Sequence, residues 1–185
     1  QLQDSIAAAK REANNAFGDE TLLFEKYLPS ARHIEVQVLF DQHGNGVHLF
    51  DRECSAQRRH QKVIEEAPAP KVPDEIRELL FSTSLELCRN VAYSNAGTVE
   101  FIFDGKAAYF LEMNTRIQVE HCVTEMITGI DIVEQQIKVA SGQPLGLTQD
   151  QVLSNGHAIE ARVYAEDPTN NFLPQSGKAT FVRWP

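Results

Sequence analysis

Two glutamates in an apolar hairpin pattern are the first residues of this sequence that could do chemistry. Glu100 belongs to a run of apolar residues, and Glu112 ends the next such run. If an odd number of residues connects the two runs, such as residues 104–106, both carboxylates project from one sheet face; a two-residue turn would separate them. Like charges so placed repel and resist desolvation, so they indicate a bridging cation or basic ligands.

Asn114 follows this pair and could add an amide oxygen. Two carboxylates and an amide suit a hard ion such as Mg²⁺, which would hold nucleotide phosphates. The alternative is a pair of strand glutamates that face solvent and bind no metal. The hairpin pattern alone does not decide between these two interpretations.

The segment after Asn114 carries a second polar set. Arg116, Gln118 and Glu120 alternate with apolar residues and His121, so an extended conformation would place them on one face. Arg116 offers a planar fork to a small anion, and Glu120 beside it could accept a proton. The alternative is an ordinary amphipathic strand with a surface ion pair.

A local excess of positive charge interrupts an otherwise acidic chain with a formal net charge of -9. It consists of Arg58, Arg59, His60 and Lys62. Such a patch can draw phosphates or small anions into a cleft and neutralise the charge that builds during phosphoryl transfer. The alternative is a solvated charged loop.

Composition limits the class of protein. The 185 residues are 42% hydrophobic, enough for a substantial core, and the acidic balance argues against a general nucleic-acid binder. Cys54, Cys88 and Cys122 lie far apart and suggest neither a disulfide framework nor a zinc site. No apolar run approaches the roughly 20 residues that cross a bilayer. We expect a chain of the cytoplasm or the mitochondrial matrix, without a membrane span.

The first half of the chain is predicted to be mainly strands. The spacing of Ile6, Ala9, Ala13 and Phe17 predicts a helix that Gly18 ends. Strands are expected at residues 22–28, 33–40 and 47–50, the last two joined by a turn. Residues 52–70 are expected to form a long functional loop.

The second half predicts two helices and further strands. One helix begins at Asp74 with Ile76, Leu79, Leu80, Thr83 and Leu87 facing inward. The other begins at an Asp131–Glu134 capping box, turns Val133, Ile137 and Ala140 inward and ends at Gly142. Strands are expected at residues 98–103, 108–112, 157–164 and 180–184. Antiparallel strands with helices on one side indicate an α+β fold.

Several motifs together resemble biotin carboxylases, members of the ATP-grasp superfamily, along essentially the whole chain. They are E-K-Y-L at residues 25–28, R-H-I-E-V-Q at 32–37, Q-R-R-H-Q-K-V-I-E-E-A-P-A-P at 57–70, E-M-N-T-R-I-Q-V-E-H at 112–121, G-H-A-I-E-A-R at 156–162 and A-E-D-P at 165–168. The resemblance implies a partial ATP-grasp domain at residues 1–150 and the start of a C-terminal subdomain at 151–185. It also implies that the family's glycine-rich phosphate loop belongs upstream of Gln1, so we expect this piece alone to be inactive.

The resemblance also implies an activity. In such enzymes ATP, with Mg²⁺ or Mn²⁺, phosphorylates bicarbonate to carboxyphosphate, whose breakdown yields carbon dioxide for the ureido nitrogen of biotin. The biotin is carried on a carboxyl carrier domain outside this chain, and a separate carboxyltransferase selects the acceptor. The parent enzyme is expected to be oligomeric, without nucleic-acid or membrane partners.

The implied roles fall on individual residues. ATP-binding positions are Glu25, Lys26, Leu28, His33, Gln57, His60 and Glu100. Metal-binding positions are Glu100, Glu112 and Asn114. Bicarbonate-binding positions are Lys62, Arg116, Gln118, Val119 and Glu120. Catalytic positions are Lys62, Arg116, Glu120 and Arg162, and Arg162 also faces biotin.

The sequence departs from the family pattern in places, and alternative kinds of protein have to be weighed. Cys122 stands where the family usually has proline. Another ATP-grasp carboxylate-amine ligase would share the metal glutamates, but the loop at residues 57–62 and the run at 116–120 argue against it. A non-catalytic fragment that keeps only the fold is the rival of a different class. Residues 164–174 lean toward the α chains of acyl-CoA carboxylases, such as the methylcrotonyl type.

Overall fold

The protein is described by a computed structural model that covers residues 2–183. These residues form two compact units that divide after Ser30. The first unit contains helix α1 (Leu2–Phe17). Gly18, with φ of 70°, closes the helix by donating its backbone N–H to the Asn14 carbonyl at 2.9 Å. The predicted helix and its left-handed C-terminal glycine are therefore confirmed.

The strand predicted at residues 22–28 is wrong, because that segment has no regular structure. Leu23 and Tyr27 are exposed. A strand is stable only when neighbouring strands satisfy its backbone N–H and C=O groups. Among the residues that the structure describes, no strand pairs with this segment.

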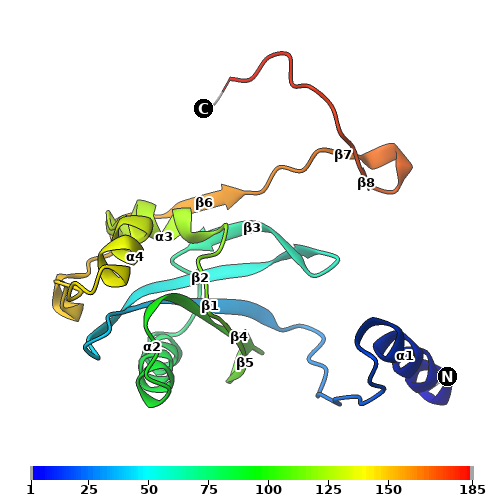
Figure 1. The fold of residues 1–185 in the computed structure, drawn as a ribbon, viewed down its shortest axis with the longest axis horizontal. Coiled ribbons are helices and arrows are strands. Elements are labelled where there is room, and N and C mark those ends of the chain that lie inside the picture. Colours follow the sequence, from blue (N-terminus) through cyan, green and yellow to red (C-terminus); the bar gives the residue numbers. More distant parts are fainter. Residues whose placement is uncertain (1, 184–185) are drawn as a thin grey trace. The chain divides into compact units, whose positions relative to one another are not determined.

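A six-stranded sheet in the order β5-β4-β1-β2-β3-β6 organises the second unit, and all its neighbouring strands are antiparallel (Figure 1). Its strands are β1 (Arg32–Phe40), β2 (Gly46–Arg58), β3 (Gln61–Ala67), β4 (Asn95–Phe103), β5 (Ala108–Asn114) and β6 (Ala158–Ala161). Short 3₁₀ turns at Gln149–Gln151 and Pro168–Asn170 and the strand pair β7 (Glu166–Asp167) and β8 (Leu173–Pro174) complete the regular structure after residue 140.

The long loop predicted at residues 52–70 is wrong, because most of it forms the hairpin of β2 and β3. The turn consists of Arg59 and His60, with φ of 51° and 63°. Two residues of positive φ give the turn geometry that matches the twist of paired strands. Polar residues on both faces of this hairpin conceal its alternation in the sequence.

Helices cover both faces of the sheet, rather than one as expected (Figure 1). Helix α2 (Asp74–Asn90) packs on one face, where its Leu80 and Phe81 join a core with β1 and β4. Helices α3 (His121–Thr128) and α4 (Ile132–Ala140) cover the other face. The four core residues that β1 gives to the α2 side are Ile34, Val36, Val38 and Phe40.

The sets of inward-facing residues predicted for α2 and α4 are partly wrong. In α4 the buried residues are Ile132 and Val139, while Val133 and Ile137 are exposed. The Asp131 cap is confirmed, since its carboxylate accepts the Glu134 backbone N–H at 2.7 Å. Helix α3 was not predicted from the sequence. We expected the segment before it to be extended up to residue 121.

The C-terminal strands are shorter than expected. β6 covers only part of the predicted 157–164 strand. Residues 180–183 form no strand, and Trp184 lies outside the described residues. Within residues 2–183, no helix has both the length and the apolar content to cross a membrane.

Two leucines of α2 provide a test of this packing. Leu80 is 1% exposed and Leu79 is 53% exposed, although the sequence places both in the inward stripe. We expect Leu80→Ala to lower the free energy of unfolding by about 2–5 kcal/mol, because it leaves a cavity. Leu79→Ala is the matched control and should change it by less than about 1 kcal/mol. Urea titration followed by circular dichroism measures both, and similar losses would contradict the assigned face.

Candidate active site

A row of charged residues crosses four strands on the sheet face away from α2. Arg52 on β2 lies opposite Glu35 on β1, Glu35 lies opposite Glu100 on β4, and Glu100 lies opposite Glu112 on β5. Directly opposed residues of antiparallel strands project from the same face. The prediction that Glu100 and Glu112 share a face is therefore confirmed.

The reason for this alignment differs from the one expected. The connection between β4 and β5 has four residues, 104–107, because Phe103 pairs with Ala108. An even connection alone would place Leu111 opposite Glu100. A register shift after Glu100 adds one residue to β5, so that Glu112 takes this position instead.

A second bulge aligns Arg52. The register between β1 and β2 shifts at Phe50, which has a φ of 66°. Without this extra residue, Asp51 would lie opposite Glu35 and Arg52 would point toward α2. Instead Asp51 faces that helix and accepts a hydrogen bond from Arg77 at 2.6 Å. The bulge thus directs the positive charge to the site and the negative charge to the α2 side.

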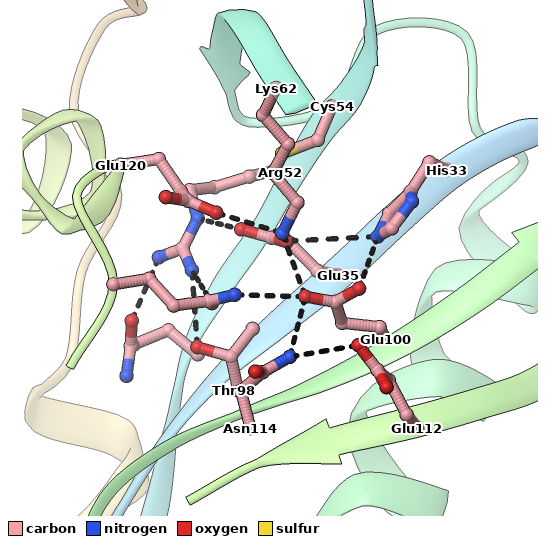
Figure 2. A network of polar contacts seen from close by, with 12 residues as sticks. His33, Glu35, Arg52, Cys54, Lys62, Thr98, Glu100, Glu112, Asn114 and Glu120 are labelled. Carbon is pink, nitrogen blue, oxygen red and sulfur yellow. Dashed lines mark hydrogen bonds and ion pairs between the residues drawn. The ribbon is translucent and has the colours of Figure 1, made fainter. Parts of the chain in front are cut away.

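Arg52 is fully buried and organises the polar side chains of this face (Figure 2). Its Nε donates to Glu35, Nη1 donates to Gln37 at 2.8 Å and Thr124 at 2.9 Å, and Nη2 donates to Thr98 at 3.2 Å and Gln118 at 3.4 Å. Burial alone would lower the pKa of Arg52, but the neighbouring carboxylate of Glu35 raises it. The guanidinium therefore stays charged and links four elements.

Lys62 places a second cation in the middle of three carboxylates. Its Nζ contacts Glu35, Glu100 at 2.7 Å and Glu120 at 2.8 Å. Burial disfavours the ammonium, but the carboxylates, Glu35 above all, raise the pKa of Lys62. Glu35 would itself resist ionisation in this buried place, yet Arg52 and Lys62 lower its pKa.

Glu100 receives the densest set of contacts. Its carboxylate accepts hydrogen bonds from Lys62, from Asn114 Nδ2 at 2.8 Å and from Gln118 Nε2 at 2.8 Å, and it lies 2.7 Å from His33 Nε2. Burial works against the charge, but the contacts of His33 and Lys62 lower the pKa of Glu100 to about 2. This carboxylate is ionised at any physiological pH.

An open pocket of about 660 Å³ lies over this network. It is lined by His33, Gln57, His60, Gln61, Lys62, Glu100, Ile102, Leu111, Glu112, Asn114, Arg116, Gln118, Val119, Glu120 and Arg162. Every site residue that the sequence predicts within the second unit lines this pocket. The predicted residues Glu25, Lys26 and Leu28 belong to the first unit, where Glu25 and Lys26 are exposed and Leu28 is partly buried.

The predicted positive patch is divided in the structure. His60 and Lys62 line the pocket, but Arg58 forms an ion pair with Glu166 and lies 4.4 Å from the centre of the Phe172 ring. Arg59 donates to Asn171. Arg58 and Arg59 therefore do not join the positive charge of the pocket, because the hairpin turn directs them to the β7–β8 segment.

The segment 115–120 is a loop, not the extended strand that we expected. Gln118 and Glu120 are nevertheless buried at the site, while Val119 is half exposed between them. Arg116 lies at the pocket rim, where its Nη2 donates to Asn114 Oδ1 at 3.3 Å. Helix α3 begins directly after Glu120 and fixes the end of this loop.

Three potential metal-binding side chains converge below the pocket. Asn114 Nδ2 lies 2.8 Å from Glu100 and 3.4 Å from Glu112. The amide would need to rotate by half a turn to present its oxygen to a cation. Two other groups bring potential ligand atoms within 4.8 Å of one another, namely His33–Glu35–Glu100 and Glu35–Cys54–Glu120. Lys62 already neutralises the carboxylates of both groups.

Sequence reasoning missed the residues beneath the pocket floor. The sequence predicts a loop at Arg52 and only the polar side of a strand at Glu35 and Gln37, although all three side chains are fully buried. Their signal was available, because His33, Glu35 and Gln37 alternate with four apolar residues. A strand whose two faces are both buried must pair such polar groups with partners.

Comparison with known sequences identifies the family. Residues 1–148 match the family described as carbamoyl-phosphate synthase L chain, ATP binding domain, and the chain belongs to it. The fold is therefore that of an ATP-binding domain.

Individual relatives narrow the class. The chain is 54% identical to biotin carboxylase 2 of Bacillus subtilis over 185 residues, which is 100% of this chain and 41% of that protein. It is 52% identical to the mitochondrial methylcrotonoyl-CoA carboxylase subunit alpha of Rattus norvegicus over 186 residues, 100% of this chain and 26% of that protein. The chain thus spans well under half the length of these relatives, and the resemblance to biotin carboxylases is confirmed.

Solved structures give the same result. The biotin carboxylase complex with β-γ-ATP from Campylobacter jejuni has a TM-score of 0.87 and 50% identity over 94% of this chain and 39% of its own. The biotin carboxylase domain of the 2-oxoglutarate carboxylase of Hydrogenobacter thermophilus, in complex with MgADP, ADP and bicarbonate, has a TM-score of 0.88 and 49% identity over 94% of this chain and 38% of its own. The predicted ATP-grasp fold is confirmed.

The buried arginine allows a stability test of the network. Arg52→Met leaves Glu35 buried with Lys62 as its remaining cation, so we expect the free energy of unfolding at pH 7 to fall by about 3–5 kcal/mol. In the unchanged chain the lowered pKa of Glu35 stabilises the fold above about pH 4.5 and less so below it. The deficit of the variant should therefore shrink as the pH falls.

Lys138→Met provides the control, because Lys138 pairs with Glu134 on the exposed side of α4 at 2.9 Å. Such a surface pair contributes less than about 1 kcal/mol. Urea titrations across the acid range measure both variants. Equal, small losses for the two would show that Arg52 does not organise the site.

Proposed function

We propose that this chain forms the ATP-, metal- and bicarbonate-binding part of a biotin carboxylase, in which ATP drives the carboxylation of biotin through carboxyphosphate. The observation that carries the proposal is the position of Lys62 between Glu100 and Glu120 on the floor of a pocket whose rim bears Arg116. A one-carbon anion needs cations to bind it and a base to remove its proton, and this arrangement offers both.

The chain's own residues would divide the work as follows. Arg116 and Gln118, with the backbone at Val119, hold bicarbonate beside Lys62. Glu120 takes the bicarbonate proton as the resulting carbonate oxygen attacks the γ-phosphorus of ATP and ADP leaves. Carboxyphosphate then separates into phosphate and carbon dioxide, the phosphate takes the N–H proton of the ureido group of biotin, and the ureido nitrogen attacks the carbon dioxide. The ion pair with Lys62 keeps Glu120 aimed into the pocket in readiness.

Glu100, Glu112 and Asn114 fit a magnesium or manganese ion, because two opposed carboxylates and an amide are hard oxygen donors. A bound ion would neutralise the charge of the ATP phosphates. Glu100 is already ionised, since its pKa lies near 2, and so needs no proton loss to bind a cation. Glu112 is the more exposed of the two and remains open toward the pocket.

The nucleotide would also contact the β2–β3 hairpin and β1. His33 and Gln57 meet at 3.1 Å and line the pocket together with His60. These three residues are proposed to lie near the ribose and phosphates. Glu25, Lys26 and Leu28 are proposed to contact adenine on the strength of the family motif at residues 25–28.

Biotin would enter beside Arg162, which lines the pocket and lies 4.9 Å from the centre of the Tyr164 ring. Arg116 would stabilise the enolate form of biotin. The biotin would be presented by a carboxyl carrier domain and passed to a carboxyltransferase, in an oligomeric enzyme of the cytoplasm or mitochondrial matrix. The subunit names of the relatives support this assignment.

The chain by itself covers 41% of the Bacillus subtilis relative, so we expect it to show no bicarbonate-dependent ATP hydrolysis, with or without free biotin. A coupled assay for ADP measures this. Isothermal titration with magnesium-ATP tests separately whether the 185 residues keep a binding site. Sustained turnover by the chain alone would contradict the expectation.

In a complete biotin carboxylase domain that contains this chain, Glu120→Gln should lower kcat for bicarbonate-dependent ATP hydrolysis by roughly 10²–10⁴-fold, because the general base is lost. Affinity for ATP should be nearly unchanged. Glu134→Gln, an exposed change on α4, is the control and should retain full activity. Wild-type rates in the Glu120 variant would refute the proposed base.

A further inference from the structure

Two glutamates that the proposed chemistry does not use face each other beside Glu120. Glu65 on β3 lies directly opposite Glu160 on β6. Directly opposed residues bring their Cβ atoms to within about 4.5–5.5 Å. Glu65 is only 2% exposed, and Glu160 is half-buried. Two carboxylates at this spacing would repel each other strongly if both were ionised.

One carboxylate oxygen of each side chain lacks a hydrogen-bond donor. Glu65 Oε2 and Glu160 Oε2 are both buried, and neither has a hydrogen-bond partner among residues 2–183. An ionised carboxylate only accepts hydrogen bonds, whereas a protonated one also donates. One proton on the pair would therefore supply the missing donor and remove the repulsion at once.

The neighbours of the pair connect it to the site. Burial, together with the charges of Glu120, Glu160 and Glu35, raises the pKa of Glu65 to about 7 against the lowering effect of Lys62. Burial and Glu120 also raise the pKa of Glu160, while three cationic groups oppose them. Those groups are His121 on α3, Arg52 on β2 and Arg162 after β6.

A register shift explains why Glu65 reaches Glu120. The pairing of β2 with β3 shifts between the Ala56–Ile64 pair and the Gln57–Lys62 pair. Residues three positions apart normally point to opposite faces of a strand, but an extra residue between them reverses this. Lys62 and Glu65 can therefore both face Glu120.

We propose that Glu65 and Glu160 share a single proton across the β3–β6 pair and act as a positioning pair that tunes Glu120 as a base. The role in tuning rests on the function proposed above. The charge of Glu120 disfavours ionisation of the pair, and the coupling is reciprocal, so the charge of the pair acts in turn on Glu120. The protonation state of Glu65 and Glu160 thus influences how readily Glu120 accepts a proton from bicarbonate.

The first test measures the proton directly in the 185-residue chain. Carboxyl ¹³C shifts of the two glutamates, assigned with Glu65→Gln and Glu160→Gln, should show one ionisation with a midpoint near 7. Glu160→Gln should lower the midpoint of Glu65 by roughly one pH unit, because a neighbouring negative charge is removed.

Glu66→Gln is the matched control, since Glu66 is adjacent in β3 but contacts His157 at 2.5 Å. It should leave the Glu65 midpoint unchanged. Midpoints below about 5 for both Glu65 and Glu160 in the unchanged chain would overturn the shared proton.

The second test measures the tuning in a complete biotin carboxylase domain that contains this chain. Between about pH 6 and 9, kcat/KM for bicarbonate should rise roughly threefold through the ionisation of the pair, as expected for a stronger base. Glu65→Gln mimics the protonated acid and should abolish this rise without changing KM for ATP, while Glu66→Gln keeps it. A Glu65 variant that keeps the rise would overturn the tuning role.

The two tests fail separately. If the unchanged domain shows no bicarbonate-dependent hydrolysis, the proposed function fails and the tuning role fails with it. The ¹³C titration still decides whether the pair holds a proton.

Discussion

The buried guanidinium of Arg52 is the interaction on which the site depends. A charge without solvent requires compensation, and Glu35 supplies it with a full negative charge while neighbouring oxygens accept the remaining N–H groups. Glu35 also contacts Lys62, so the two cations share one anion. The result is a network of ion pairs and hydrogen bonds in which each charged side chain fixes the position of the others. Lys62 is held by its contacts with Glu35, Glu100 and Glu120 rather than by packing alone.

The sheet provides the frame for this network. Opposed positions on four strands carry the charged row, and a second row of Gln37, Thr98 and Asn114 runs beside it. Backbone hydrogen bonds between strands fix these separations, so the functional side chains need little reorganisation to meet a ligand. The irregular part of the site is the loop at residues 115–120, which ends where α3 begins.

The sequence predicts the elements better than their alignment. Helix α1, strand β1 and the β4–β5 hairpin follow directly from periodicity and turn residues. The bulges at Phe50 and near Leu111 have no clear signal, because an extra residue in a strand costs little and is specified by distant packing. The β2–β3 hairpin was not predicted either, because polar residues on both of its faces leave no clear alternation in the sequence. The site residues predicted within the second unit line the pocket, whereas the sequence does not reveal the roles of Arg52 and Glu35, which are buried beneath it.

The pairing of β6 with β3 has a consequence for how such proteins can be divided. The family match ends at residue 148, yet the strand at Ala158–Ala161 completes the sheet on the β3 side. A cut at the family boundary would remove this strand and leave the β3 backbone groups that face it without partners, close to Lys62. Recombination between homologues at that boundary would therefore pair β3 of one parent protein with β6 of another, although these two strands evolved together in each parent. Exchangeable modules in this lineage should instead be delimited beyond the sixth strand, where backbone pairing between the segments ends.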